Sequence, residues 1–305
     1  MEKSSSKLKI ALVMALGAVV VLAAVLVWKA SQIQAAADYL PRYQYSQSKV
    51  VEVNGRQGIA TDGTSYWVSG TTSLTKYDKD WKVIAQNTTP FAGRESEVNH
   101  FGDIDVYNND VYVSAEYFKD GVGKNIQIAI YDGDTLQFKK AFNFNADSGQ
   151  EECAGITVNP DDKVVVLCSW VDGESGRYLY EYDLETGAYK GKVHLHCPPQ
   201  WLQGVLYSDG AYYLTSDDGT ADDNEPDHVY RVTLKPGATE ATVAPELTLS
   251  DVTFQGEIEG LTVDHKTNQL MVLYNRGSRI VLGMVKGFYP GYTKEISEVY
   301  VYNRR

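Results

Sequence analysis

The chain repeats one hydrophobic pattern five times between residues 57 and 274. In each repeat a short β-branched run, a turn rich in Asp, Asn or Gly and a second hydrophobic run follow one another, which predicts a β-hairpin. Aligned at one strand position, the repeats carry Ile59, Ile104, Ile156, Val205 and Leu261, and subtraction of these numbers gives spacings of 45, 52, 49 and 56 residues. A period of about 40–50 residues is typical of propellers and other repeat arrays.

Two further strands follow the hairpin in most repeats. The third strand ends in a Tyr-Asp pair in three of them, at Tyr77-Asp78, Tyr131-Asp132 and Tyr182-Asp183, and a fourth strand comes after it. Four antiparallel strands per unit is the composition of a propeller blade. The pattern therefore predicts an all-β fold built from blades.

The two ends of the chain complete the count. The fifth repeat supplies three strands around a long insertion at residues 275–297, and residues 49–53 offer the missing fourth strand ahead of the first repeat. We therefore predict one five-bladed β-propeller over residues 43–305, its last blade closed by residues 49–53. A six-bladed ring is the alternative if the insertion contains further strands.

The N-terminus carries a membrane signal. Residues 1–9 contain three lysines, and residues 10–28 form an uncharged apolar run of 19 residues, about the length that spans a bilayer as a helix. We expect a transmembrane signal anchor at 10–28, a cytoplasmic tail at 1–9, a stalk at 29–42 and a single-pass protein at the cell membrane with its C-terminal domain outside the cytoplasm. The alternative is a signal peptide cleaved after Ala37, which would make the protein secreted.

The net charge narrows the class of binding partner, and two of the cysteines could form a disulfide. The formal net charge is −12 at pH 7, which argues against nucleic acid, because binding a polyphosphate needs Lys and Arg. A cation, a basic protein or a neutral sugar suits such a surface better. Cys153 and Cys168 lie near the two ends of a predicted hairpin, so either a disulfide or two buried thiols would fit.

The strand openings resemble a group of extracytoplasmic propellers. The motif that carries the resemblance is Gly-hydrophobic-x-x-Asp, clearest at Glu259-Gly-Leu-Thr-Val-Asp264, and it is similar to the senescence-marker/gluconolactonase, NHL-like and SdiA-regulated propellers. The resemblance to gluconolactonase-like proteins implies a divalent metal in the central channel, held by carboxylate and Asn side chains, although those proteins have six blades. Glu259 stands at a comparable position before the strand.

In such a fold the loops that enter the innermost strands crowd around one end of the channel, and binding residues come from loops on a rigid scaffold. Carboxylates recur there, and several of them at one channel would each need a proton or a cation. Glu97, Glu152 and Glu259, with oxygens from Gln57 and Gln203, would suit Ca²⁺. Of the pair Glu257 and Glu259, we expect Glu259 to face the channel and Glu257 to lie one step outside.

Aromatic residues accompany these carboxylates. Trp170 and Trp201 stand in loops expected at the same end, and rings beside carboxylates suit a sugar or peptide. Gln57, Trp170, Trp201 and Gln203 are therefore the candidate ligand-binding residues. The candidates for proton transfer are His100, Glu152 and Glu259.

Two functions follow from these residues. The first is a membrane-anchored binding module that holds a protein, peptide or glycan at its acidic, aromatic channel face. The alternative is a calcium-dependent hydrolase of the lactone, phosphoester or nucleotide type, in which a channel metal polarises the substrate. The sequence contains no Gly-x-Ser-x-Gly, His-Glu-x-x-His or Gly-x-x-x-x-Gly-Lys-Ser/Thr motif, so none of the nucleophile, zinc-protease or phosphate-loop classes is indicated.

A calcium titration tests the alternative. A ligand that binds only the folded state raises the melting temperature, so a hydrolase of this kind should melt higher in millimolar calcium when the fragment from Asp38 onward is heated. Glu259→Gln should abolish that rise. An unchanged melting temperature with calcium and after chelation would contradict the metal-dependent reading, and a rise that survives Glu259→Gln would place the metal elsewhere.

Overall fold

The computed structural model describes residues 19–29, 39–119, 122–235, 237–281 and 283–305, and the chain divides into two compact units, residues 1–40 and 41–305. In the first unit, residues 19–29 are helical. None of the helices within the described ranges has both the length and the apolar character needed to cross a membrane. Residues 10–18 of the predicted anchor lie outside the described residues.

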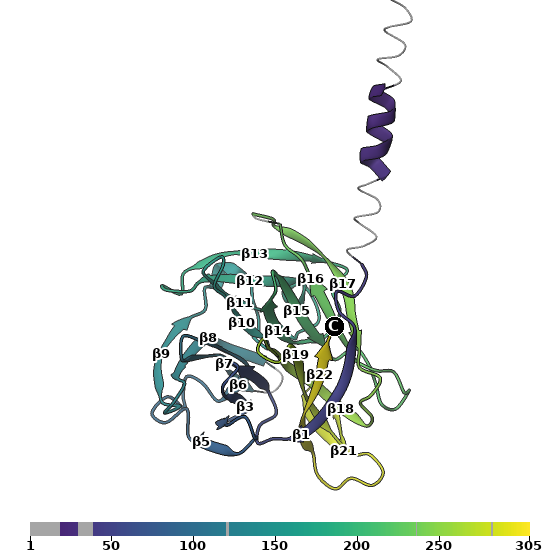
Figure 1. Ribbon diagram of the computed structural model, residues 1–305. Coiled ribbons are helices and arrows are strands. Elements are labelled where there is room, and N and C mark those ends of the chain that lie inside the picture. The colour runs from purple at the N-terminus through teal and green to yellow at the C-terminus, as the bar shows by residue number, and fades with distance from the viewer. Residues whose placement is uncertain (1–18, 30–38, 120–121, 236, 282) are drawn as a thin grey trace, which may run out of the picture. The chain divides into compact units, whose positions relative to one another are not determined.

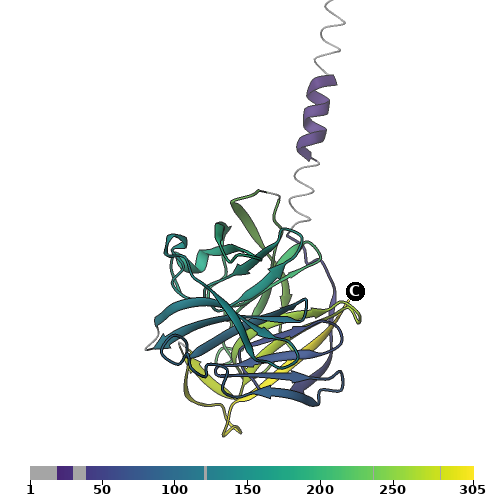
Figure 2. The same cartoon turned by 90° about the vertical axis from the view of Figure 1, so that its left-hand side faces the viewer.

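The second unit consists of β-strands with two short 3-10 turns (Figures 1 and 2). Most strands are joined by short turns and pair antiparallel with their neighbours. The strands are β1 Tyr45–Glu52, β2 Gly58–Thr61, β3 Tyr66–Gly70, β4 Ser73–Tyr77, β5 Val83–Asn87, β6 His100–Tyr107, β7 Asp110–Lys119, β8 Val122–Asp132, β9 Phe138–Asn143, β10 Ile156–Asn159, β11 Val164–Leu167, β12 Tyr178–Asp183, β13 Tyr189–His196, β14 Leu202–Ser208, β15 Ala211–Ser216, β16 His228–Val232, β17 Glu240–Thr248, β18 Gln255–Asp264, β19 Gln269–Arg276, β20 Ser278–Val281, β21 Met284–Phe288 and β22 Ile296–Arg304; the 3-10 turns are η1 Ala146–Ser148 and η2 Ser175–Arg177.

The strands pair in consecutive groups of four. The hydrogen-bonded orders are β2-β3-β4-β5, β6-β7-β8-β9, β10-β11-β12-β13 and β14-β15-β16-β17, and the third and fourth groups join into one eight-stranded sheet through parallel pairing of β13 with β17. The last group has the order β18-β19-β22-β1. The first strands of the groups contact one another in a closed cycle, β2 to β6, β10, β14, β18 and back to β2. In Figure 1 the sheets surround a common centre, with β5, β9 and β13 at the periphery.

Strand β1 joins the two ends of the second unit. It pairs antiparallel with β22, from Tyr45 opposite Arg304 to Glu52 opposite Glu298, at the edge where the sequence analysis places residues 49–53. The insertion of the last repeat contains the two-stranded hairpin β20–β21 within its described part, rather than a further four-stranded sheet.

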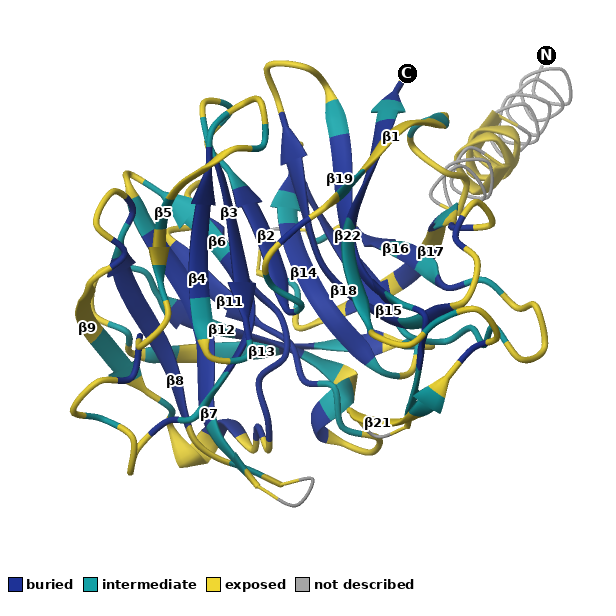
Figure 3. Cartoon of the chain, turned by 90° about the horizontal axis from the view of Figure 1, so that it is seen from below, coloured by how far each residue is buried: buried dark blue, intermediate teal, exposed yellow. Residues whose placement is uncertain are grey.

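Burial follows the distance from the centre. Strands β3 and β11 are buried along their whole length, whereas the outer strands β5 and β9 expose most of their residues (Figure 3). Strands covered on both faces need hydrophobic residues at nearly every position, which explains the unbroken apolar runs that the sequence shows there. Cys153 and Cys168 are buried free thiols, so the disulfide is not formed.

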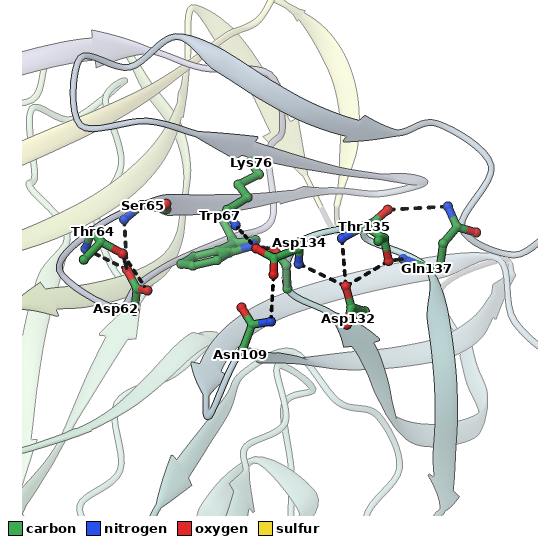
Figure 4. Close-up of polar contacts among 11 residues, drawn as sticks. Asp62, Thr64, Ser65, Trp67, Lys76, Asn109, Asp132, Asp134, Thr135 and Gln137 are labelled. Carbon is green, nitrogen blue, oxygen red and sulfur yellow. Dashed lines mark hydrogen bonds and ion pairs between the residues drawn. The ribbon is translucent and has the colours of Figure 1, made fainter.

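Aspartate turns lock neighbouring sheets together (Figure 4). Asp132 accepts hydrogen bonds from the backbone N–H groups of Asp134 (3.1 Å) and Thr135 (2.8 Å), which is how an Asp side chain fixes a turn. The turn then contacts the preceding sheet, since Asp134 pairs with Lys76 Nζ at 2.7 Å and Trp67 Nε1 donates to the Gly133 carbonyl at 2.9 Å. The Tyr-Asp pair of the sequence thus marks both the end of a strand and a contact between sheets.

Glycine occupies the most crowded position of the ring. The residue before the aligned strand position is Gly58, Gly155, Gly204 or Gly260 in four repeats and Asp103 in the second repeat. A Cβ atom on Gly260 would collide with Asp103 Oδ1 and lie 2.8 Å from Gly58 Cα. The inner strands therefore approach so closely that the buried Asp103 side chain fills the space beside Gly58, Gly204 and Gly260, while Gly155 packs against Cys168 and Val205.

We expect Gly260→Ala to lower the free energy of unfolding by about 1–3 kcal/mol, because the new methyl group has no room beside Asp103. Urea denaturation of the two proteins measures the difference. Asp103→Gly in the same chain should be non-additive with Gly260→Ala, since the two residues touch. Additive losses, or a Gly260→Ala variant as stable as the parent, would contradict the close approach.

Candidate functional site

A cavity of about 290 Å³ opens where the loops that enter the inner strands meet. Side chains from every four-stranded group reach it, together with the β20–β21 hairpin. The residues that line it are Arg56, Gln57, Thr71, His100, Gly102, Glu116, Phe118, Glu152, Ala154, Trp170, Gln203, Glu257, Glu259, Gly283 and Met284. We refer to it as the channel cavity.

The structure brings most of the candidate residues from the sequence analysis to this cavity. Those that line it are Gln57, His100, Glu152, Trp170, Gln203 and Glu259. Trp201 lies behind them, with its ring 5.0 Å from the ring of Trp170. Glu97 does not line the cavity: its side chain is 59% exposed and pairs with Arg94 Nε at 3.4 Å. The three carboxylates proposed as calcium ligands are therefore not gathered in one place.

The prediction for Glu257 is wrong, because this side chain lines the cavity beside Glu259. Strand β18 begins at Gln255, five residues before the Gly260 at which the pattern places the start of the strand. Side chains two positions apart on a strand point to the same face. Glu257 lies in this strand two positions before Glu259, and both carboxyls line the cavity, although the pairing with β19 shifts register between Ile258 and Leu261.

Glu116 and Arg56 also line the cavity, and neither is among the site residues predicted from the sequence. Glu116 lies on β7, opposite His100 of β6, so a candidate histidine on one strand identifies its cross-strand partner on the next. The sequence could indicate Glu116 through this cross-strand pairing, but only if the register of the hairpin were known.

One half of the channel cavity is a paired network, which we call the Arg56 cluster: Arg56, Gln203, Glu257, Glu259 and Asn275. Arg56 Nη2 lies 3.0 Å from Glu257 Oε2 and 3.9 Å from Glu259 Oε1. Gln203 donates to Glu257 at 2.8 Å, and Asn275 donates to Glu259 at 2.5 Å. Burial raises the pKa of Glu259 well above its ordinary value, against the opposing charge of Arg56. Most of these polar atoms are paired within the cluster; Arg56 Nε lies 2.9 Å from Glu295 Oε1 as an ion pair but outside hydrogen-bond geometry.

The other half contains polar atoms without partners, in what we call the Glu116 group: His100, Glu116, Glu152 and Trp170. Both carboxyl oxygens of Glu116, His100 Nδ1 and Trp170 Nε1 are buried and, among the described residues, have no partner in normal hydrogen-bond geometry, although the backbone N–H of Cys153 lies close enough to the Glu116 carboxyl to favour its ionised form. His100 Nδ1 lies 3.7 Å from Glu116 Oε1, and the Trp170 backbone N–H donates to Glu152 at 2.6 Å. Because buried polar groups in native proteins are nearly always hydrogen-bonded, orphaned ones at a cavity are positions for ligand atoms.

Burial controls the charge of the Glu116 group. It raises the pKa of Glu116 to about 8, and burial together with the nearby Glu116 raises the pKa of Glu152 well above its ordinary value. Burial and, secondarily, the charge of Arg56 lower the pKa of His100 to about 4. Burial therefore favours the uncharged form of each of these three side chains, and no Lys or Arg among the described residues forms an ion pair with either carboxyl.

The described side chains do not form a metal site of three or more ligands. Within the described ranges of the chain, no three His, Cys, Asp or Glu side chains are arranged to hold a metal ion.

Comparison with known proteins informs the fold. No protein-family profile matches the chain, and no curated protein matches it in sequence. Among solved structures, glutaminyl cyclase of Myxococcus xanthus superposes with a TM-score of 0.55 at 10% identity, over 85% of this chain and 97% of that one. That enzyme has a β-propeller fold.

The chain is a β-propeller.

Two other structures superpose more loosely on this propeller. The PQQ-bound aldose sugar dehydrogenase of Streptomyces coelicolor has a TM-score of 0.47 at 12% identity, over 85% of this chain and 98% of that one. Hydrazine synthase of Kuenenia stuttgartiensis has a TM-score of 0.47 at 16% identity, over 76% and 80%. At these identities the likeness concerns the fold, so the chemistry of this propeller must be argued from its own cavity.

The raised pKa of Glu116 gives a prediction about stability. A carboxyl whose pKa is higher in the folded state stabilises the fold fully below the unfolded value, near 4.5, and that contribution is lost as the pH rises toward about 8. We expect Glu116→Gln to match the parent near pH 5 and to exceed its stability at pH 8 by about 1–3 kcal/mol, since a tenfold change in proton affinity corresponds to about 1.4 kcal/mol.

Urea denaturation at the two pH values measures this effect. Glu97→Gln is the matched control, because Glu97 is exposed, and it should show no such pH-dependent gain. A Glu116→Gln variant whose stability relative to the parent is the same at both pH values would contradict the account.

Proposed function

We propose that the protein is a five-bladed β-propeller that binds an amine-bearing ligand, such as the amino end of a peptide, in its channel cavity. The observation that carries the proposal is the pair of buried carboxyls in the Glu116 group, beside which the described part of the chain leaves polar atoms without partners and places no Lys or Arg in ion-pair contact.

The blade count rests on the strand orders. Each sequence repeat corresponds to one group of four strands, and the first strands of these groups contact one another in a cycle of five. The parallel pairing of β13 with β17 links two adjacent blades at their outer edges. On this reading β1 is the outermost strand of the last blade, and the insertion is a hairpin added to the ring.

Charge supports an amine as the ligand group. Glu116, Glu152, Glu257 and Glu259 are each at most 4% exposed, and the one arginine that lines the cavity is already shared among Glu257, Glu259 and Glu295. A ligand ammonium beside Glu116 and Glu152 would favour their ionised forms and would offer donors to the orphaned oxygens of Glu116.

Shape and size support a small ligand or the end of a chain. A volume of about 290 Å³ lies at the lower limit of ordinary ligand sites, which range from roughly 300 to 1,000 Å³. Trp170 and Phe118 supply aromatic surface at the same wall, and rings attract cations as well as apolar groups. Trp170 Nε1 can donate to a carbonyl oxygen of the ligand, which favours a peptide over a simple amine.

Two further predictions from the sequence, calcium-dependent hydrolysis and membrane anchoring, rest on separate observations. Calcium-dependent hydrolysis stays a prediction that the titration above tests. Membrane anchoring stays a proposal that rests on the uncharged run of residues 10–28, and placement outside the cytoplasm rests on the lysines before it.

Thermal unfolding of the full-length protein in detergent tests the amine site. Millimolar Ala-Ala amide should raise the melting temperature, because it binds the folded state alone, whereas N-acetyl-Ala-Ala amide, which lacks the charge, should not. Glu116→Gln should abolish most of the rise, and Glu97→Gln should preserve it. An equal response to the free and acetylated dipeptides would sink the proposal.

A further inference from the structure

The hairpin β20–β21 carries large exposed apolar side chains, and Gly283 and Met284 within it line the channel cavity. We call this surface the apolar hairpin and define it by four side chains whose exposed fractions range from 40% to 52%: Val281, Met284, Val285 and Phe288. Val281 lies opposite Met284 across the hairpin, whereas Val285 follows Met284 on the same strand and so points to the other face. Single exposed apolar residues are normal on a protein surface, but four on one short hairpin indicate an interaction site.

The apolar hairpin is continuous with the channel cavity. Gly283 and Met284 line the cavity directly. At the base of the hairpin, Ser278 Oγ donates to Glu295 Oε2 at 2.9 Å, and Glu295 Oε1 lies 2.9 Å from Arg56 Nε. The hairpin is thus joined through Glu295 to the Arg56 cluster, which forms one wall of the cavity.

The base of the hairpin is also held from the side. Arg279 makes a two-pronged contact with Asp222, with Nη2–Oδ1 at 2.8 Å and Nε–Oδ2 at 3.1 Å, and its guanidinium lies 4.5 Å from the centre of the Tyr289 ring. A paired arginine of this kind restricts the geometry of the strand that carries it. The apolar side chains are therefore presented from an anchored support.

We propose that the apolar hairpin binds the residues that follow the amino end of a peptide seated in the channel cavity, and that it selects peptides with apolar side chains there. The inference rests on the proposed function, because it requires the amino end to occupy the cavity.

The geometry of the cavity supports this occupant. About 290 Å³ accommodates only the first part of a peptide, so the rest of the chain must leave through the mouth, where Met284 forms part of the wall. In addition, β20 and β21 form a sheet of two strands in the described part of the chain, which leaves a strand edge for main-chain hydrogen bonds. An extended peptide that adds to an open edge gains affinity from its backbone and specificity from its side chains.

A lipid surface fits the same hairpin less well. Asp222 neutralises Arg279, the neighbouring loop carries the further acidic residues Asp223 and Glu225, and the formal net charge is −12. Anionic membrane surfaces attract basic segments and repel acidic ones.

Two amidated peptides test the proposal on the full-length protein in detergent. Both begin with Ala-Ala; one continues Leu-Val-Leu and the other Ser-Gln-Ser, and each carries a fluorophore at its carboxyl end for anisotropy. We expect the apolar peptide to bind at least tenfold more tightly. The double variant Val281→Ser with Val285→Ser should lose most of that preference while Ala-Ala amide still raises its melting temperature, because neither residue lines the cavity.

The matched control is Val83→Ser with Ile84→Ser, two residues of β5 that are 47% and 54% exposed and lie outside the cavity lining and the hairpin. This control should keep the tenfold preference. Near-ultraviolet circular dichroism checks that both double variants retain the parental fold.

Each contrary outcome has its own meaning. Equal affinity of the parent for the two peptides, with Ala-Ala amide still bound, overturns the hairpin inference and leaves the proposed function standing. Failure of Ala-Ala amide and both peptides to bind overturns the two together. Binding of phosphatidylcholine vesicles that is lost in the hairpin variant and kept in the β5 control overturns the peptide in favour of a lipid surface.

Discussion

The close approach of the inner strands at the centre of the ring is the constraint on which the rest of the structure depends. Glycines occupy four of the five equivalent positions, and Asp103, at the remaining one, fills the space beside three of them. Side-chain hydroxyls secure the same approach one layer out: Ser69 donates to the Gly102 carbonyl at 2.8 Å, Ser114 to Ala154 at 2.7 Å and Thr215 to Glu259 at 2.6 Å. Each of these bonds ties the second strand of one group to the entry of the next.

This convergence also creates the electrostatics of the channel cavity. Residues at the entries of the inner strands are brought together regardless of their charge, so four carboxyls share a small and largely buried volume. Such groups must be protonated, paired or met by a ligand cation. The Arg56 cluster uses pairing, whereas the Glu116 group retains carboxyls without a cation and polar atoms without partners.

The polar groups are paired in one half of the cavity and largely unpaired in the other, and this difference indicates which half would bind a ligand. A satisfied network is rigid and specifies position, while orphaned polar groups are costly unless a ligand completes them. The hairpin β20–β21 departs from the repeat pattern and contributes Met284 to the lining, so the one large insertion of the ring lies at its candidate site. Insertions in loops on a rigid scaffold commonly carry the specificity of a protein.

Much of the architecture could be predicted from the chain alone, because strand and turn patterns are local and repeat with a regular period. The Tyr-Asp pairs mark the ends of third strands and their aspartate turns, as Asp132 shows, and the unbroken apolar runs mark strands buried on both faces, as in β11. Alignment of the repeats also placed Gln57, Gln203 and Glu259 at equivalent strand entries, with Glu152 two residues before the equivalent Ala154, and all four line the cavity.

Pairing between strands determined which side chains reach the cavity, and the sequence did not predict this pairing in full. The start of β18 at Gln255 depends on its hydrogen bonds to β19, and it turned Glu257 toward the channel. Glu116 reaches the cavity through its register opposite His100, while Glu97, equally acidic and only three residues from His100, points to solvent and pairs with Arg94. Local sequence specifies which segments become strands and turns, but the direction of a side chain, its burial and hence its proton affinity depend on neighbours that only the folded ring brings together.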